Sequence, residues 1–286
     1  MKAKVISGIL GALFGITMLI LQFTPVFSIV VAFFTFMANF ELLRTAGVKN
    51  KGIYALTSVA ATAIPFILEY DLTQYLPVPT MIVFLLYVFV LVLMMLKSYE
   101  TTRFEHVSMA LVSSLLVPYL ISLLIAIRDF GDFPRSTNVY LTLFALTNAW
   151  ITDSMAYFFG SKFGKHKMAP KISPKKSWEG AVGGVFGNIV VNMIVWGVFY
   201  LLYKLELINK VMFPLWLVPI ASVILAVIGM LGDLSASAIK RNYGVKDYGT
   251  IMGEGQGGVM DRFDSAVFVI GAMYAFLQIY GCIALR

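Results

Sequence analysis

Long apolar runs separated by short polar segments dominate the sequence from one end to the other. Each run is about as long as the ~20 apolar residues that a helix needs to cross a bilayer. Helices are expected because they satisfy their own backbone hydrogen bonds in lipid, and the runs are too long and uniformly apolar for barrel strands. The pattern therefore predicts an all-α, polytopic integral membrane protein of about nine transmembrane helices, at 5–22, 25–43, 53–70, 79–97, 107–127, 137–160, 181–203, 211–234 and 263–285.

Composition supports the membrane interpretation. Of the 286 residues, 59% are hydrophobic and 13% are charged, and a soluble domain has too little interior to bury that much apolar surface. The first run follows Lys2 and Lys4, but it is longer than the apolar region of a signal peptide and no A-x-A cleavage site follows it. We expect this run to be a membrane anchor. The single cysteine, Cys282, excludes an internal disulfide.

The basic residues are distributed unevenly between the two sides of the predicted membrane. With nine crossings, 17 of the 22 lysine and arginine residues fall on the side of the N-terminus. Cytoplasmic connections carry the excess of basic residues in membrane proteins. We therefore predict a plasma membrane (bacterial inner membrane) protein with a cytoplasmic N-terminus and the C-terminus outside.

The two parts of the chain differ in where their polar residues lie. Residues 1–136 have short loops and charges at helix ends, which predicts N-terminal transmembrane scaffold helices. Residues 137–286 carry polar groups inside the helices and two polar cytoplasmic loops, 161–180 and 238–264. The first loop contains six lysines between residues 162 and 176. This part is predicted to be the catalytic region.

Two aspartates lie within or at the end of predicted helices. Asp153 lies in the sixth helix, where a carboxylate is costly unless it faces a cavity or a partner; a structural salt bridge is the alternative. Asp233 ends the eighth. If that helix continues, Ser237, Lys240 and Arg241 share the face of Asp233 and place an acid, a hydroxyl and two cations in one row.

A second pair of acids begins the ninth predicted helix. Asp261 and Asp264 are three residues apart and share a face. Capping of the helix N-terminus would explain one of them, but not easily two with Arg262 between them. The glycines that precede this helix, Gly257 and Gly258 among them, allow backbone N–H groups to converge on an anion, unless they form only a flexible linker.

The first loop contains a stiff turn with two cations. Lys175 and Lys176 follow Pro174, and contact with anionic lipid is the alternative to a phosphate-binding role. Together the loops offer hard oxygen donors that suit Mg²⁺ and cations that neutralise phosphate. A second metal ion or a monovalent cation is left open. This combination indicates phosphoryl or nucleotidyl transfer. The donors are Asp153, Asp233, Asp247, Asp261 and Asp264, and the cations are Lys175, Lys176, Lys240, Arg241, Lys246 and Arg262.

Several motifs of the C-terminal half resemble the phosphatidate cytidylyltransferase (CDP-diacylglycerol synthase) family. The longest match begins at Ser237 and ends at Asp264, and it includes the segment Gly-Gly-Val-Met-Asp-Arg-Phe-Asp at 257–264. Residues 153–160 and 172–180 are also similar to that family. One position departs from the pattern, because this chain has Gly255 and Gln256 where the family has a histidine before the glycine pair.

The resemblance implies that CTP and phosphatidic acid are converted to CDP-diacylglycerol and pyrophosphate in phospholipid biosynthesis. It implies metal binding by Asp153, Asp233, Asp261 and Asp264. It places the nucleotide against Ser173, Lys175, Lys176, Gly257 and Gly258. The remaining catalytic residues would be Lys240, Arg241, Lys246, Asp247 and Arg262. The implied partners are the two substrates, the lipid bilayer and a second copy of the chain in a homodimer, with no nucleic acid.

Two other functions are open from the residues alone. A membrane transporter also uses intramembrane acids, but no inverted repeat is visible and the charges gather on one side of the membrane. Another lipid phosphotransferase, such as an alcohol phosphatidyltransferase, would carry a D-G-x-x-A-R type motif, which this sequence lacks.

Overall fold

The computed structural model describes residues 13–75, 77–249 and 257–284. Residues 13–21 are helical. The remaining long helices are α2 (Pro25–Thr45), α3 (Lys51–Glu69), α4 (Thr80–Lys97), α5 (Phe104–Leu111), α6 (Val117–Arg128), α7 (Arg135–Phe163), α8 (Trp178–Lys204), α9 (Leu217–Asn242) and α11 (Ala266–Ala284). The shorter elements are a 3-10 turn η1 (Leu72–Tyr75), a π-helical turn η2 (Val112–Leu116), the strands β1 (Lys167–Ala169) and β2 (Ser173–Ser177), and α10 (Met260–Phe263).

The predicted fold class is confirmed. Six helical segments among the described residues are long and apolar enough to cross a membrane, with α5, η2 and α6 counted as one segment. The apolar part of α11, Ala266–Cys282, is shorter, and α7 is 29 residues long but carries polar side chains. Every predicted window contains a helix over most of its described residues; the beginning of the first window lies outside the described residues.

The structure differs from the prediction in two places. The loop 161–180 contains an antiparallel hairpin in which β1 pairs with β2. In addition, α9 begins at Leu217 instead of residue 211. The residues before it are apolar but irregular, because side chains bind their peptide groups: Met212 N donates to Thr137 Oγ1 (3.1 Å), and Phe213 O accepts from Trp196 Nε1 (2.9 Å).

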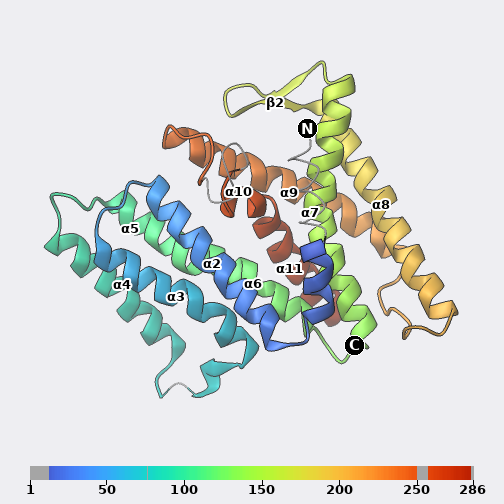
Figure 1. Ribbon diagram of the computed structural model, residues 1–286, viewed down its shortest axis with the longest axis horizontal. Coiled ribbons are helices and arrows are strands. Elements are labelled where there is room, and N and C mark those ends of the chain that lie inside the picture. Colours follow the sequence, from blue (N-terminus) through green and yellow to red (C-terminus); the bar gives the residue numbers. More distant parts are fainter. Residues whose placement is uncertain (1–12, 76, 250–256, 285–286) are drawn as a thin grey trace.

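The helices form two groups with α9 and α11 between them (Figure 1). Helices α2 to α6 lie together on one side, and α7 and α8 lie side by side on the other, below the hairpin. Glycines bring α7 and α8 close: a Cβ on Gly184 would lie 2.9 Å from the Cβ of Ala156 and 3.0 Å from Thr152 O. Small residues permit such close helix packing in membranes.

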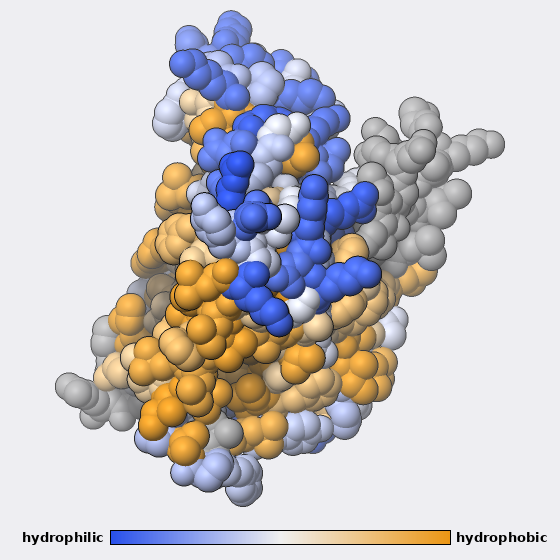
Figure 2. Space-filling view, turned by 90° about the vertical axis from the view of Figure 1, so that its left-hand side faces the viewer, coloured by the Kyte–Doolittle hydropathy of each residue, from blue (hydrophilic) through white to orange (hydrophobic). Residues whose placement is uncertain are grey.

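An apolar region lies between two polar ends on one face of the molecule. Figure 2 shows hydrophobic residues across the middle of one face, with hydrophilic residues gathered at the top and a smaller number at the lower edge. Many large apolar side chains are exposed on the long helices, for example Val182, Ile194 and Leu201 on α8. Such a surface is stable in lipid and not in water.

Candidate active site

The base of the hairpin is attached to the beginning of α8. Ser177 ends β2 and caps α8, accepting a hydrogen bond from Gly180 N through its Oγ (3.2 Å). The Glu179 carboxylate accepts hydrogen bonds from the backbone N–H groups of Lys165 (3.1 Å) and His166 (3.2 Å). A carboxylate in the first turn of a helix is also favoured by the helix dipole. These contacts fix the direction in which β2 presents its lysines.

A hollow of about 190 Å³ lies between α7, β2 and α9. Asp153 comes from α7, Lys175 and Lys176 from β2, and Asp233 from α9. The rest of the lining is mainly small or apolar: Ala156, Tyr157, Met168, Ser177, Gly180, Ala181 and Met230. One small space thus joins two acids and two lysines with a lining of the kind that contacts hydrocarbon.

The acids of this hollow contact groups from distant parts of the chain and, for Asp233, also from its own helix. Lys176 Nζ lies 2.5 Å from Asp233 Oδ2, in an ion pair without the angles of a regular hydrogen bond. Ser265 Oγ donates to Asp153 Oδ2 (2.7 Å). Ser237 Oγ donates to Asp233 Oδ1 at a long 3.4 Å. Lys176 therefore joins the first loop to α9, and Ser265, which follows the second loop, binds α7 at the same hollow.

A second cluster lies at the cytoplasmic end of α9 in the predicted topology. Lys240 Nζ lies 2.8 Å from Asp261 Oδ1 and 3.5 Å from Asp264 Oδ2. The other oxygen of Asp261 accepts hydrogen bonds from Tyr248 N (2.8 Å) and Gly258 N (2.9 Å). Lys240 is only 7% exposed and Asp264 9%, so both charges depend on this pairing. Both oxygens of Asp261 are thus occupied by groups of the chain itself.

Asp264 lies before α11, outside the apolar helices. Burial, followed by the negative charge of Asp233, raises the pKa of Asp264 above its usual value, although Lys240 opposes the shift. A further contribution in the same direction comes from Asp153. Three acids therefore influence one another at this point, and a bound cation would relieve their repulsion.

Arg241 connects the second loop to the hairpin. Its Nε donates to Ile172 O (3.3 Å) in the turn between the strands, and its Nη1 donates to Val245 O (2.9 Å). Both acceptors are backbone carbonyls, one in the first loop and one in the second. The guanidinium therefore holds the two loops together in this arrangement.

The remaining predicted residues lie farther from the hollow. Ser173 pairs with Ala169, at the opposite end of β2 from Lys176. Lys246 and Asp247 are exposed in the loop after α9. Arg262 is exposed on α10, and its backbone carbonyl accepts from Trp150 Nε1 at 3.4 Å. The roles assigned to these residues stay predictions.

Gly257 and Gly258, the glycines predicted to bind the nucleotide, both lie close to Asp261. Gly257 has φ +78°, a left-handed conformation that glycine adopts without strain. Gly258 donates its N–H to the Asp261 carboxylate, so this N–H is not directed at a substrate phosphate. Residues 250–256, including the departure at Gly255 and Gln256, lie outside the described residues.

The donor set fits a hard cation in chemistry, with carboxylate and hydroxyl oxygens from Asp153, Asp233 and Asp264 and the nearby serines. Within the described part of the chain, no three acidic, histidine or cysteine side chains converge closely enough to hold a metal ion. Lysines pair with Asp233 and Asp264 instead. A cation at this position therefore requires these side chains to exchange partners.

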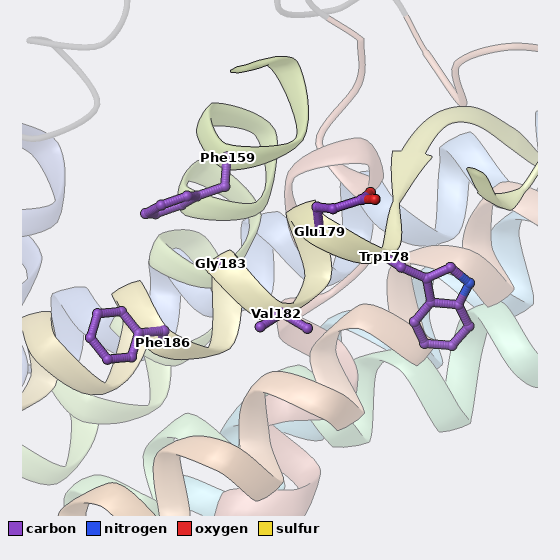
Figure 3. A pocket seen from close by; sticks show the side chains of 6 residues that line it. All are labelled: Phe159, Trp178, Glu179, Val182, Gly183 and Phe186. Atoms are coloured by element: carbon purple, nitrogen blue, oxygen red, sulfur yellow. The ribbon is translucent and has the colours of Figure 1, made fainter. Parts of the chain in front are cut away.

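A larger hollow of about 520 Å³ lies on the outer side of the α7–α8 pair (Figure 3). It is lined by Phe159, Trp178, Glu179, Val182, Gly183 and Phe186. In Figure 3 the Glu179 carboxylate points away from the two phenylalanine rings. Since that carboxylate binds the base of the hairpin, the larger hollow offers only apolar surface and no group for phosphate chemistry.

One further acid, Glu41, belongs to this region and was not predicted from the sequence. Glu41 lies in the apolar window 25–43, is 1% exposed, and binds the segment just before α10. A carboxylate inside an apolar window is the same signal that identified Asp153. It was overlooked because the N-terminal half was interpreted as scaffold.

Comparisons with known proteins agree with the motifs. Residues 2–280 match the family described as "Cytidylyltransferase family". A phosphatidate cytidylyltransferase of Bacillus subtilis (strain 168) is 31% identical over 283 residues, which cover 98% of each chain. Proteins of the same name are 40% identical in Staphylococcus haemolyticus and 42% identical in Staphylococcus saprophyticus, each over 136 residues and 48% of each chain. The resemblance found in the sequence is confirmed.

Proposed function

Because this chain belongs to the cytidylyltransferase family, we propose that it transfers the cytidylyl group of CTP to phosphatidic acid at the hollow between α7, β2 and α9. The observation that carries this assignment is the ion pair between Lys176 of the hairpin and Asp233 of α9, beside Asp153. The transporter alternative has no comparable support. The same holds for the alcohol phosphatidyltransferase alternative.

The reaction needs little proton chemistry from the protein. An oxygen of the lipid phosphate attacks the α-phosphorus of CTP, the bond to the β-phosphate oxygen breaks, and pyrophosphate leaves. A phosphomonoester has a second pKa of about 6, so the nucleophile is mostly dianionic at neutral pH. The main barrier is the approach of two anions, and the protein lowers it by positioning and charge neutralisation.

The lysines of the site supply that neutralisation. Lys176 and Lys175 line the hollow from the hairpin, and Lys240 lies at the adjoining acid cluster. Without substrate, Lys176 and Lys240 pair with aspartates, so each of these two ammonium groups has a counterion. We infer that the phosphates of the substrates take over the lysines, which releases carboxylate oxygens for a cation.

The lipid is expected to reach the site from the side. Met168, Met230 and Tyr157 line the hollow together with the charged residues, and two long helices, α7 and α9, form part of its wall. This arrangement lets the phosphate headgroup approach the lysines while the acyl chains stay in the bilayer. A homodimer, which the resemblance implies, stays a prediction that the mass of the detergent-solubilised protein would test.

We propose that Mg²⁺ is the cation, held by Asp153, Asp233 and Asp264. When bound, it would polarise the α-phosphate and neutralise the leaving pyrophosphate. Asp261 has both oxygens occupied by the chain, so its contribution is to hold Lys240 and the loop at Tyr248 in place. This division of roles modifies the predicted metal set of Asp153, Asp233, Asp261 and Asp264.

Removal of divalent cations is expected to lower the rate of CDP-diacylglycerol formation by at least about 10²-fold, because charge neutralisation at the phosphates is lost. The measurement is product formation after treatment with EDTA, followed by titration with Mg²⁺. Restoration of activity by Mg²⁺ is the control for denaturation. Full activity in EDTA would contradict the metal proposal.

Both loops are expected to lie on the cytoplasmic side. In a Cys282→Ser background, cysteines placed at the exposed positions Lys171 and Lys246 should react with a membrane-impermeant maleimide only in inverted vesicles. A cysteine at Lys210, in the connection between α8 and α9, should react in intact cells. Labelling of positions 171 and 246 from opposite sides would contradict a shared site.

A further inference from the structure

The C-terminal end of α2 supports the segment that carries Asp261 and Asp264. Glu41 accepts hydrogen bonds from Val259 N at 2.9 Å and from Met260 N at 2.8 Å, one with each carboxylate oxygen. These are the first N–H groups of α10, which have no partners within the helix. A residue 218 positions earlier in the chain therefore caps the beginning of the acid-bearing segment.

Two glycines are needed for this contact. A Cβ on Gly258 would lie 2.3 Å from Glu41 Oε1 and 2.4 Å from Oε2, and a Cβ on Gly249 would lie 2.7 Å from Oε1. Any side chain at either position would collide with the carboxylate. The glycine at 258 is thus explained by the close approach of Glu41, and its own N–H is donated to Asp261.

Further contacts keep α2 against the same segment. Thr45 Oγ1, one turn beyond Glu41, donates to Tyr248 O at 3.4 Å, and Tyr248 N donates in turn to Asp261 Oδ2. The ring centroids of Phe34 on α2 and Phe263 on α10 lie 5.1 Å apart. Glu41 is therefore part of a continuous contact between an N-terminal helix and the acids of the site.

We propose that Glu41 is a positioning residue for cytidylyl transfer, and that it holds the 257–264 segment so that Asp261 binds Lys240 and Asp264 faces the cation. The carboxylate acts through the backbone and touches no substrate. This inference rests on the proposed function for its kinetic consequences. Its structural part, the attachment of the segment to α2, is independent of the reaction.

The kinetic test uses Glu41→Gln in the full-length protein. An amide accepts one N–H through its oxygen but presents its own N–H₂ to the other, so one backbone donor loses its partner. We expect the Mg²⁺ concentration for half-maximal activity to rise about 10- to 100-fold and kcat to fall, as is typical when the support of a metal ligand is removed. Glu105→Gln, an exposed glutamate near the same end of the molecule, is the matched control.

A purely structural role would lower the yield of folded protein without changing the Mg²⁺ dependence of the folded fraction. The kinetic part of the proposal would be overturned if the wild type were active and Glu41→Gln had the same kcat and the same Mg²⁺ concentration for half-maximal activity. Absence of activity in the wild type would instead contradict the proposed function.

A second measurement needs no activity. Hydrogen–deuterium exchange of peptides covering 257–265 should be faster in Glu41→Gln than in wild type, whereas peptides covering β2 (Ser173–Ser177) should be unchanged. Equal exchange at 257–265 in the two proteins would overturn the attachment itself.

The glycine contact gives a third, independent test. Gly258→Ala should lower the activity of the wild type. It should lower the activity of a Glu41→Ala protein clearly less, because the methyl group then has space. Gly197→Ala, where a Cβ would meet nothing within 4 Å, is the control for glycine replacement. Additive effects of Gly258→Ala and Glu41→Ala would contradict direct contact.

Discussion

Asp261→Asn is expected to lower kcat about 10³-fold, while the protein still inserts and folds. The replacement weakens a buried ion pair with Lys240, and the amide must present its N–H₂ either to that ammonium or to the backbone donors of Tyr248 and Gly258. Breaking a buried pair costs about 3–5 kcal/mol, which corresponds to about 10²- to 10⁴-fold in rate if the cost falls on the transition state. The measurement is CDP-diacylglycerol formation by purified variant and wild type.

The control for this variant is Asp132→Asn, at an exposed position in the connection before α7. It should keep the activity of the wild type. Size-exclusion profiles in detergent would show whether Asp261→Asn is folded. A folded Asp261→Asn protein with full activity would remove Asp261 from the site.

Lys176→Met is expected to lower kcat/KM for CTP about 10²-fold. Lys176 is the hairpin cation closest to the acids, and charge-assisted hydrogen bonds of the kind it would make to phosphate contribute about 1.5–3 kcal/mol each. The variant also leaves Asp233 without its ion pair, so the loss should persist at saturating CTP. Steady-state kinetics with varied CTP at fixed phosphatidic acid measures both effects.

Lys171→Met is the matched control, because Lys171 is an exposed lysine in the turn of the same hairpin. It retains the hairpin and removes the same charge from its surface. If Lys171→Met and Lys176→Met lost activity equally, the hairpin would act only through its general positive charge, and a specific role for Lys176 would be wrong.

Much of the fold could be predicted because lipid restricts the possibilities. Apolar runs of the required length must be helices, and the structure has helix in every predicted window that it describes. The hairpin could not be predicted, because its pairing depends on the attachment of its base to Glu179. The start of α9 at Leu217 depends on side-chain contacts to Met212 and Phe213, which apolar periodicity does not reveal.

The candidate site could be predicted where the residues lie on one helix or in one motif. The continued helix α9 places Asp233, Ser237 and Lys240 in register, as expected from their spacing. The pairing of Lys176 with Asp233 joins segments far apart in the sequence, and no spacing within one helix or motif predicts it. Glu41 was missed because its partners are backbone N–H groups more than 200 residues away, and backbone groups leave no pattern in a sequence.

The most direct test of the account is an assay of the purified full-length chain with CTP labelled at the α-phosphate, phosphatidic acid and Mg²⁺. We predict a labelled liponucleotide formed in equal amount with pyrophosphate. Absence of this product, both from the chain as it stands and from a Gln256→His variant, would contradict cytidylyl transfer at this site.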